Sequence, residues 1–368
     1  MRDAVLRLDA LTAPVPVRSW LSFKTHPLEA LADRWLRDGR GVEVVSEREL
    51  ATMRALGAGV DDMLVNGIAK HSWLPRQSMP RLRVHFDSPH ELEALLPTAL
   101  EHEWRVGVRV HAPDECDRRE PCFRGQFGFS YGEAVTALRR LKSVGADLQS
   151  VHFHLGQRQH EPGAYVRAVD LAAAACDEAG VAPTIVDCGG ALPVGEEAVE
   201  RAALDDLTSA MERAGVRFPA LRELWLENGR FITEASAALA VRVVDIKERD
   251  ECRYLICDGG RTNQALAADA RPHELVVLPH RSGRERLTTV CGPTCMTDDR
   301  LGRWLLPESI DVGDVIAWLD AGAYHLPWET RFSHGLCAVV WFDEEERPAI
   351  VRPRERMPQV PEMQWAAS

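Results

Sequence analysis

Lysine is scarce in this chain, and one of its lysines stands where covalent chemistry is feasible. Four lysines occur, whereas arginine supplies the rest of the positive charge. Lys142 and Lys247 lie in charged stretches typical of a solvated surface, but Lys24 ends the first apolar, strand-like run. A lysine amine in a desolvated site can form a Schiff base with an aldehyde. A lysine at a strand end can also extend to water, so position alone does not decide between the two.

Two glycine-containing turns end later strand-like runs and could hold an anion. Asp187-Cys-Gly-Gly supplies Gly189 and Gly190, and Glu227-Asn-Gly-Arg puts a carboxylate beside Gly229. Backbone amides in such turns approach a phosphate closely. A plain turn is the commoner explanation of a single Gly-Gly pair, so the interpretation depends on the combination of residues.

Two histidines, His152 and His154 in HFHLGQ, end another of these runs. Each could simply be a hydrogen-bonded core histidine. A lysine, a carboxylate, a flat imidazole and a glycine cradle at one rim nevertheless meet the requirements of an aldehyde cofactor with a pyridine ring and a phosphate. The set therefore predicts a site for pyridoxal 5′-phosphate (PLP), with Lys24 as its Schiff-base lysine.

Eight β-rich runs must position these residues, and stretches with helical apolar spacing separate them. The runs are residues 19–24, 42–46, 62–67, 81–86, 105–110, 148–154, 183–189 and 223–229. Strands that alternate with helices favour an α/β fold, a (β/α)8 TIM-like barrel, in which strand ends meet at one rim. We predict this barrel over residues 17–235, after an N-terminal helix or extension over residues 1–16.

The pattern changes after about residue 236, where β-rich runs follow one another with few helical intervals. They are residues 238–248, 252–260, 273–280, 286–293, 314–322, 337–345 and 348–353. These runs predict a C-terminal all-β domain, barrel-like or sandwich-like, over residues 236–352. The proline-rich, polar residues 353–368 are typical of a surface tail.

Composition limits the partners. The net charge is −12, which disfavours nucleic acid and favours a small-molecule substrate. No apolar run reaches the roughly 18 residues of a membrane helix, and the N-terminus lacks a signal-peptide pattern, so we expect a cytoplasmic protein that does not insert into membranes. The nine cysteines lack the paired spacing of a zinc site, so we expect reduced thiols and no metal.

With these residues identified, the chain resembles the fold-type III PLP-dependent decarboxylases, the group that contains ornithine, arginine and diaminopimelate decarboxylases. The resemblance runs from Lys24 to about Leu336. It rests on a series of motifs in family order, namely SFK, VVSEREL, QFG, HFHLGQ, DCGGALP, ENGRF, CGPTC and DAGAY. A specific, ordered series of this kind implies a decarboxylase of an amino acid.

The resemblance also implies roles for single residues. Lys24 would form the internal aldimine, His154 would stack on the cofactor ring, and Glu227 would pair with the pyridine nitrogen. Arg109 would organise the site near the ring. The phosphate would be bound by Gly189, Gly190, Gly229, Arg230 and the hydroxyl of Tyr324.

Cys295 of CGPTC matches the family cysteine that returns a proton to Cα after CO2 has left. In the family this cysteine acts across a dimer interface, so the resemblance implies a homodimer with shared active sites. The alternative for Cys295 is a small buried hydrophobic residue, the usual fate of a free cysteine.

The chain departs from the family near this cysteine. Many members have an acidic residue next, which recognises the charged end of the substrate, and this chain has Met296. Asp299 matches a family aspartate but occupies another position. Arg261, Asn263 and Arg271 are candidate anion contacts. We therefore expect a substrate with a neutral or anionic distal end, such as an amino-acid conjugate of a siderophore-like or other natural-product pathway, rather than a diamine precursor.

Other departures are Gln126, where the family commonly has lysine, Gln157, where it often has serine, and a leading β-strand that is absent or shortened. Two other functions stay open. A racemase or aldolase could use the same cofactor on the same fold, and a decarboxylase-like chain can be a non-catalytic regulator.

Overall fold

The computed structural model describes residues 1–77, 79–112, 126–156, 161–249, 252–264, 273–343 and 345–355. Gln157, Arg271 and most of the tail at 353–368 lie outside the described residues. The chain divides into two compact units, residues 1–233 and 234–368. No helix in the described ranges is long and apolar enough to cross a membrane.

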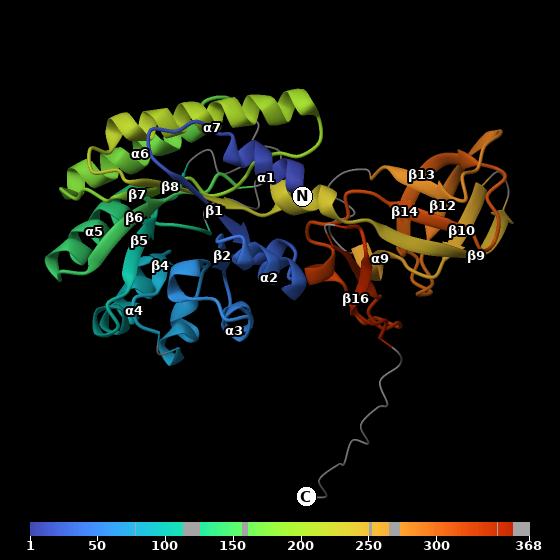
Figure 1. Ribbon diagram of the computed structural model, residues 1–368, viewed down its shortest axis with the longest axis horizontal. Coiled ribbons are helices and arrows are strands. Elements are labelled where there is room, and N and C mark those ends of the chain that lie inside the picture. The colour runs from blue at the N-terminus through green and yellow to red at the C-terminus, as the bar shows by residue number, and fades with distance from the viewer. Residues whose placement is uncertain are drawn as a thin grey trace, which may run out of the picture. The chain divides into compact units, whose positions relative to one another are not determined.

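Eight parallel strands form a closed barrel in the first unit, in sequence order (Figure 1). They are β1 (Val17–Ser22), β2 (Gly41–Val44), β3 (Met63–Val65), β4 (Arg83–Phe86), β5 (Arg105–Arg109), β6 (Asp147–His152), β7 (Ile185–Asp187) and β8 (Glu223–Asn228). Every strand overlaps one of the eight predicted runs, so the predicted barrel is confirmed. The strands are mostly apolar because most of their residues are buried, as expected for a parallel sheet with covered faces.

Helices alternate with the strands and lie outside the ring that the strands form (Figure 1). They are α1 (Arg2–Asp9), α2 (Glu29–Arg37), α3 (Glu47–Ala55), α4 (Pro89–Glu101), α5 (Tyr131–Ser143), α6 (Ala164–Ala179), α7 (Glu197–Arg217) and α8 (Arg230–Thr233). Serines begin three of them, namely Ser46 of α3, Ser88 of α4 and Ser130 of α5. The hydroxyls of Ser46 and Ser88 accept hydrogen bonds from the backbone N–H of Glu49 and Glu91, both at 3.3 Å, which satisfies N–H groups that a helix leaves unpaired.

The strand register collects polar side chains at one rim. Ser22 of β1 pairs with Glu43 of β2. Arg109 of β5 pairs with His152 of β6, and His152 pairs with Asp187 of β7. Each of these residues stands at or near the carboxyl end of its strand. They therefore lie at the end of the barrel where enzymes of this fold place their sites.

The second unit is mainly sheet, as predicted, and most of its strand pairs are antiparallel. A six-stranded sheet has the order β11-β14-β9-β10-β12-β13, and β15 and β16 form a separate hairpin. The strands are β9 (Leu239–Arg249), β10 (Cys252–Cys257), β11 (Leu275–Leu278), β12 (Glu285–Cys291), β13 (Arg300–Pro307), β14 (Val315–Trp318), β15 (Val339–Phe342) and β16 (Pro348–Arg352). A short helix, α9 (Arg261–Gln264), follows β10.

Strand β13 was not among the predicted β-rich runs. Its sequence, RLGRWLLP, has a glycine and two arginines that interrupt the apolar alternation. The strand forms because it pairs with β12 along its length and buries Leu301 and Leu306 in the core that contains Trp318. Pairing and burial decide strand formation where the local preference is weak.

Candidate active site

Lys24 lies in the 3₁₀ turn η1 (Phe23–Thr25), directly after β1. Its Nζ donates hydrogen bonds to Ser22 Oγ at 2.8 Å and to the two carboxylate oxygens of Glu43 at 2.8 and 3.0 Å. Glu43 is buried, whereas the Lys24 side chain is 38% exposed. The amine is therefore anchored by a buried carboxylate and still accessible at the rim.

The other lysines have different surroundings. Lys70 is fully buried, and its Nζ pairs with Glu91 at 2.7 Å. Lys142 donates to the backbone carbonyl of Gly180 at 2.6 Å on the barrel exterior. Lys247 is on β9 of the second unit. Among the four lysines, all of which the structure describes, Lys24 is the one with a partly exposed amine at the barrel rim.

His154 follows β6 and packs against the loop after β7. The Gly156 N–H donates to His154 Nδ1 at 3.0 Å, so the neutral ring carries its proton on Nε2. Burial, assisted by the positive charge of Arg109, lowers the pKa of His154 to about 3. The imidazole is thus neutral near pH 7. Gly189 has a φ of +63°, and a Cβ there would lie 2.6 Å from the Phe153 carbonyl oxygen.

Gly190 and Gly229 also stand where a side chain would not fit. A Cβ on Gly190 would overlap the Glu227 carbonyl oxygen and lie 3.4 Å from His154 Nε2. A Cβ on Gly229 would overlap Thr25 Oγ1 in the Lys24 turn. The glycines thus bring the backbone of the β7 and β8 loops against His154 and the Lys24 turn, and the Gly189 N–H donates to Asp187 Oδ1 at 2.9 Å.

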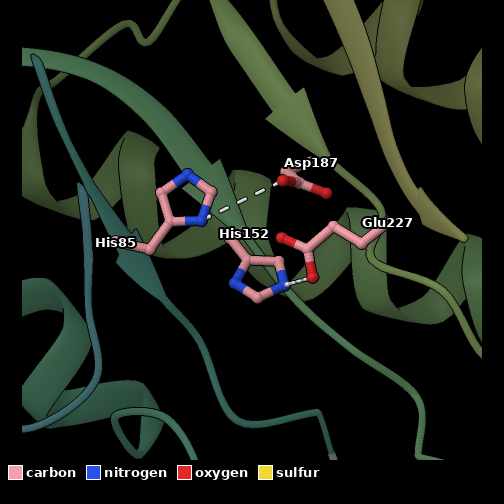
Figure 2. Close-up of side chains that lie close together, drawn as sticks. All are labelled: His85, His152, Asp187 and Glu227. Carbon is pink, nitrogen blue, oxygen red and sulfur yellow. Dashed lines mark ion pairs between the residues drawn. The ribbon is translucent and has the colours of Figure 1, made fainter. Parts of the chain in front are cut away.

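Glu227, near the end of β8, is the buried anion of the site. Asn66 Nδ2 donates to its Oε1, and His152 Nε2 lies 3.5 Å from its Oε2 (Figure 2). Burial opposes ionisation, but interaction with His152 prevails and lowers the pKa of Glu227 well below its ordinary value. Burial and repulsion by Glu227 raise the pKa of Asp187 well above its ordinary value. Glu227 is therefore charged and Asp187 protonated.

Two arginines predicted for the site also lie at this rim. Arg109 ends β5, with its guanidinium carbon 4.6 Å from the centre of the Phe127 ring and Nη1 3.9 Å from Asp87 Oδ1. Arg230 begins α8, next to Gly229. Gln126, which replaces the family lysine, is exposed.

The loop between β12 and β13 carries the predicted thiol. Cys295 is exposed in this chain and has a φ of +62°, so its interpretation as a small buried hydrophobic residue is wrong. Met296 is 52% exposed. Asp299 is buried, and its carboxylate accepts hydrogen bonds from the Arg261 N–H at 2.8 Å, the Thr294 N–H at 2.9 Å and Thr294 Oγ1 at 2.6 Å. Asp299 therefore organises the loop that carries Cys295.

Asn263 and Tyr324 are the remaining candidates in the second unit. Asn263 Oδ1 accepts a hydrogen bond from the Gly260 N–H at 3.1 Å, at the start of α9. Tyr324 belongs to the DAGAY turn and has a φ of +63°. The predicted contacts of Asn263 with the substrate and of Tyr324 with the cofactor remain predictions.

Sequence reasoning missed three rim residues, Glu43, Asn66 and His85. Each is a polar residue in or directly after an apolar strand, in GVEV, MLVN and RVHF. A polar group in a buried strand needs a partner, so this signal was present in the sequence. The partners come from other strands and depend on the barrel register.

The chemistry of the rim fits PLP. Lys24 offers an amine for the aldehyde of PLP, Glu227 a carboxylate for the ring nitrogen, and His154 a neutral flat ring for the ring face. The glycines offer a backbone without side chains, which a phosphate can approach closely. Thr25 Oγ1, beside Gly229, is buried and has no hydrogen-bond partner in the described part of the chain, which leaves a polar atom available to a ligand. Fold and site together define a (β/α)8-barrel enzyme of PLP.

Two family models match the chain. Residues 11–234 match the pyridoxal binding domain of the pyridoxal-dependent decarboxylases, and residues 168–322 match their C-terminal sheet domain. The chain belongs to the pyridoxal-dependent decarboxylase family, as the ordered motifs predicted. PLP is its cofactor, and it is an amino-acid decarboxylase. The racemase, aldolase and regulator alternatives have no support from these matches.

Relatives within the family differ in substrate. The diaminopimelate decarboxylase of Archaeoglobus fulgidus is 26% identical over 80% of this chain and 74% of its own length. The L-glutamyl-[BtrI acyl-carrier protein] decarboxylase of Niallia circulans is 25% identical over 87% of this chain and 81% of its own. A solved diaminopimelate decarboxylase from M. jannaschii has the same fold, with a TM-score of 0.85 at 19% identity over 96% of this chain and 87% of that one.

Proposed function

We propose that the chain decarboxylates an amino acid, free or attached to a second group, whose distal end is neutral or anionic. Met296 carries this proposal, because it places a thioether where many family members have a carboxylate. A distal ammonium would need an anionic partner when it is desolvated. Asp299 is not available for this purpose, because both of its carboxylate oxygens already accept hydrogen bonds within its own loop.

The relatives support this choice of substrate. Diaminopimelate has a carboxylate beside an ammonium at its distal end, so that end has no net charge, and the Niallia circulans relative is named for a glutamyl group attached to a carrier protein. We propose that Arg261 and Asn263, on α9, contact the distal end of the substrate. A conjugated amino acid of this kind belongs to specialised biosynthesis, siderophore-like or otherwise, rather than to diamine formation.

We assign a separate role to each of the site residues. PLP, when bound, accepts the electrons that remain on Cα as CO2 departs. Lys24 would attach the cofactor, and Glu43 holds the Lys24 Nζ at the rim. Glu227 would keep the proton on the ring nitrogen, and the neutral His154 would lie against the ring face. The residues that we assign to the phosphate and its surroundings are Gly189, Gly190, Gly229, Arg230, Tyr324 and Arg109.

Cys295 donates its thiol proton to Cα after CO2 has left and becomes a thiolate. We propose that it serves the site of a partner subunit in a homodimer, as the family resemblance implies. The β15–β16 hairpin of the second unit exposes Val340, Phe342 and Ile350, and Val340 pairs with Ile350 across it. Neighbouring exposed apolar side chains are typical of an interaction surface, which supports an assembly through this unit.

The experiment is a panel of amino acids and conjugates, incubated with purified holoenzyme and followed by CO2 release and product mass. The panel holds ornithine, lysine, diaminopimelate, glutamate and glutamate linked through either carboxyl group. We expect loss of one CO2 from acidic or conjugated members and turnover of ornithine and lysine at least 100-fold slower. Rapid turnover of ornithine or lysine would overturn the substrate proposal.

A matched variant sharpens this experiment. Met296→Glu restores a carboxylate after Cys295. We expect this variant to raise kcat/KM for ornithine or lysine by roughly tenfold, which corresponds to about 1.4 kcal/mol. We expect it to lower kcat/KM for the acidic members of the panel. Met296→Leu, which adds no charge, is the control. Equal profiles for the two variants would remove Met296 from substrate selection.

A further inference from the structure

Two buried histidines near Glu227, His85 and His152, contact each other across a position of the intervening strand that is occupied by glycine. His85 comes from β4 and His152 from β6, and β5 lies between these strands. His85 is opposite Gly107 of β5 in the register, and Gly107 is opposite Ser150. A Cβ on Gly107 would overlap Ser150 Oγ and lie 2.6 Å from His85 Cδ2. The missing side chain therefore creates the space in which β4 and β6 touch.

The contact across this space is specific. The two imidazoles are stacked, with ring centroids 4.8 Å apart and an interplanar angle of 24°. His85 Nε2 lies 2.9 Å from Ser150 Oγ, and His85 Nδ1 lies 3.9 Å from Asp187 Oδ2. His152 Nε2 points at Glu227, 3.5 Å from its Oε2 (Figure 2).

The charges in this cluster are divided unequally. Burial and the neighbouring His152 lower the pKa of His85 well below its ordinary value, so His85 is neutral, and Asp187 is protonated. Glu227 is left as the anion, next to a His152 ring that His85 holds in place. Other charged or titratable groups that act on these four are Glu43, Lys70, Arg109 and His154.

We propose that His85 and His152 are positioning residues for Glu227, and that their stacked rings keep this carboxylate ionised and aimed at the cofactor ring nitrogen. The inference rests on the proposed role of Glu227. Without His152, Glu227 keeps Asn66 as a donor but remains buried beside Asp187, so the proton of the ring nitrogen moves toward the carboxylate. Without His85, the His152 ring loses its stacking partner and turns away.

The same four side chains each have one possible ligand atom within 4.8 Å of the others, so a metal site is the alternative. Asp187 Oδ1 already accepts the Gly189 N–H at 2.9 Å, and Asn66 occupies one oxygen of Glu227. These two hydrogen bonds and the stacked rings favour a positioning role over a metal site.

The test reads the protonation of the ring nitrogen directly. Holoenzyme is prepared with PLP labelled with 15N in the ring, and the 15N resonance is followed from pH 6 to pH 9 without substrate. We expect the wild-type signal to stay at the protonated position and that of His152→Leu to shift toward the unprotonated one. We also expect His152→Leu to weaken PLP binding by the apoenzyme about tenfold in a fluorescence titration.

Conservative variants separate positioning from folding. His152→Gln retains an N–H donor and His85→Phe retains the stacked ring, so both should keep the wild-type 15N position more closely than His152→Leu and His85→Ala. His71 and His90 are a ring pair elsewhere on the barrel, and His90→Leu is the matched control. Circular dichroism establishes that each variant is folded.

Unchanged 15N positions in folded His152→Leu and His85→Ala would overturn the proposal. So would stoichiometric zinc in the purified protein that is lost with these histidines. Neither result depends on substrate, so a failure here is distinguishable from a failure of the proposed decarboxylation, which would show as PLP bound normally without CO2 release.

Discussion

Glu43 Oε2 lies 2.8 Å from Lys24 Nζ, so a buried carboxylate of β2 holds the amine that follows β1. The two residues are neighbours because Ser22 pairs with Glu43 in the β1–β2 register. Glu43 Oε2 also accepts the Ser22 hydroxyl. Glu43 and Ser22 therefore hold the Lys24 amine in one position when it is not attached to the cofactor.

Glu43→Gln removes the charge of this anchor but retains its shape. We expect kcat to fall roughly 10- to 100-fold, because the amine is less well placed at each turnover and each tenfold corresponds to about 1.4 kcal/mol in the barrier. Steady-state kinetics with an accepted substrate measure this, and Glu47→Gln, on the exposed side of α3, is the control. Equal rates for the two variants would contradict a role for Glu43.

Mixing two inactive variants tests the shared active site. Lys24→Ala should lose the visible absorbance of bound PLP, and Cys295→Ala should lower kcat by about 10²- to 10⁴-fold, the usual contribution of a positioned proton donor. Mixed, unfolded and refolded together in equal amounts, they should recover about a quarter of wild-type activity, because half of the dimers contain one intact site. No recovery would argue that each chain uses its own Cys295.

Gly189→Ala tests the packing of the β7 loop on His154. The substitution places a Cβ 2.6 Å from the Phe153 carbonyl oxygen at a positive φ, so we expect a loss of about 2–4 kcal/mol in the free energy of unfolding and weaker PLP binding. Chemical denaturation and PLP titration measure the two effects. Gly132→Ala, in open space near the start of α5, should be neutral or slightly stabilising.

Asp299 should act on the second unit through its loop. Asp299→Ala leaves three donors without their acceptor, and we expect destabilisation by about 2–4 kcal/mol, with lower kcat but an unchanged PLP absorbance. Asp299→Asn retains one acceptor oxygen and should be destabilised less than Asp299→Ala. Asp298→Ala, at an exposed neighbour, is the control. A large rise in KM with full stability would instead indicate that Asp299 binds substrate.

Glu49 makes stability depend on pH. Burial raises the pKa of Glu49 to about 7, although its hydrogen bond from the Val45 N–H opposes the rise. The folded chain therefore keeps a proton that the unfolded chain releases nearer pH 4.5, and this contribution to stability is lost as pH rises toward and through 7. In urea unfolding, the free energy of unfolding of Glu49→Gln, compared with that of wild type, should be higher at pH 8 than at pH 5.5. Glu93→Gln should show no such change with pH.

Much of the barrel was predictable because its signals are local. Apolar runs such as LQSVHF and ELWLEN, separated by amphipathic stretches, identify strands and helices without knowledge of their neighbours. The glycines after β7 and β8 were also predictable as turns. Their second role was not, since the clash at Gly189 is with Phe153, which belongs to another strand end. β13 was missed because its stability comes from β12 rather than from its own sequence.

By itself the sequence determined the order of strands and helices, the candidate lysine, carboxylate and thiol, and through their motifs the cofactor. Only the tertiary structure decided which groups meet. Asn66 reaches Glu227 and Glu43 reaches Lys24 because barrel closure and register bring distant strand ends to one rim. The stacking of His85 on His152 depends in addition on a glycine in the strand between them, and Asp299 proved to be part of a loop rather than an available carboxylate. Contacts of this kind arise from packing between segments far apart in the chain, which spacing along the sequence does not encode.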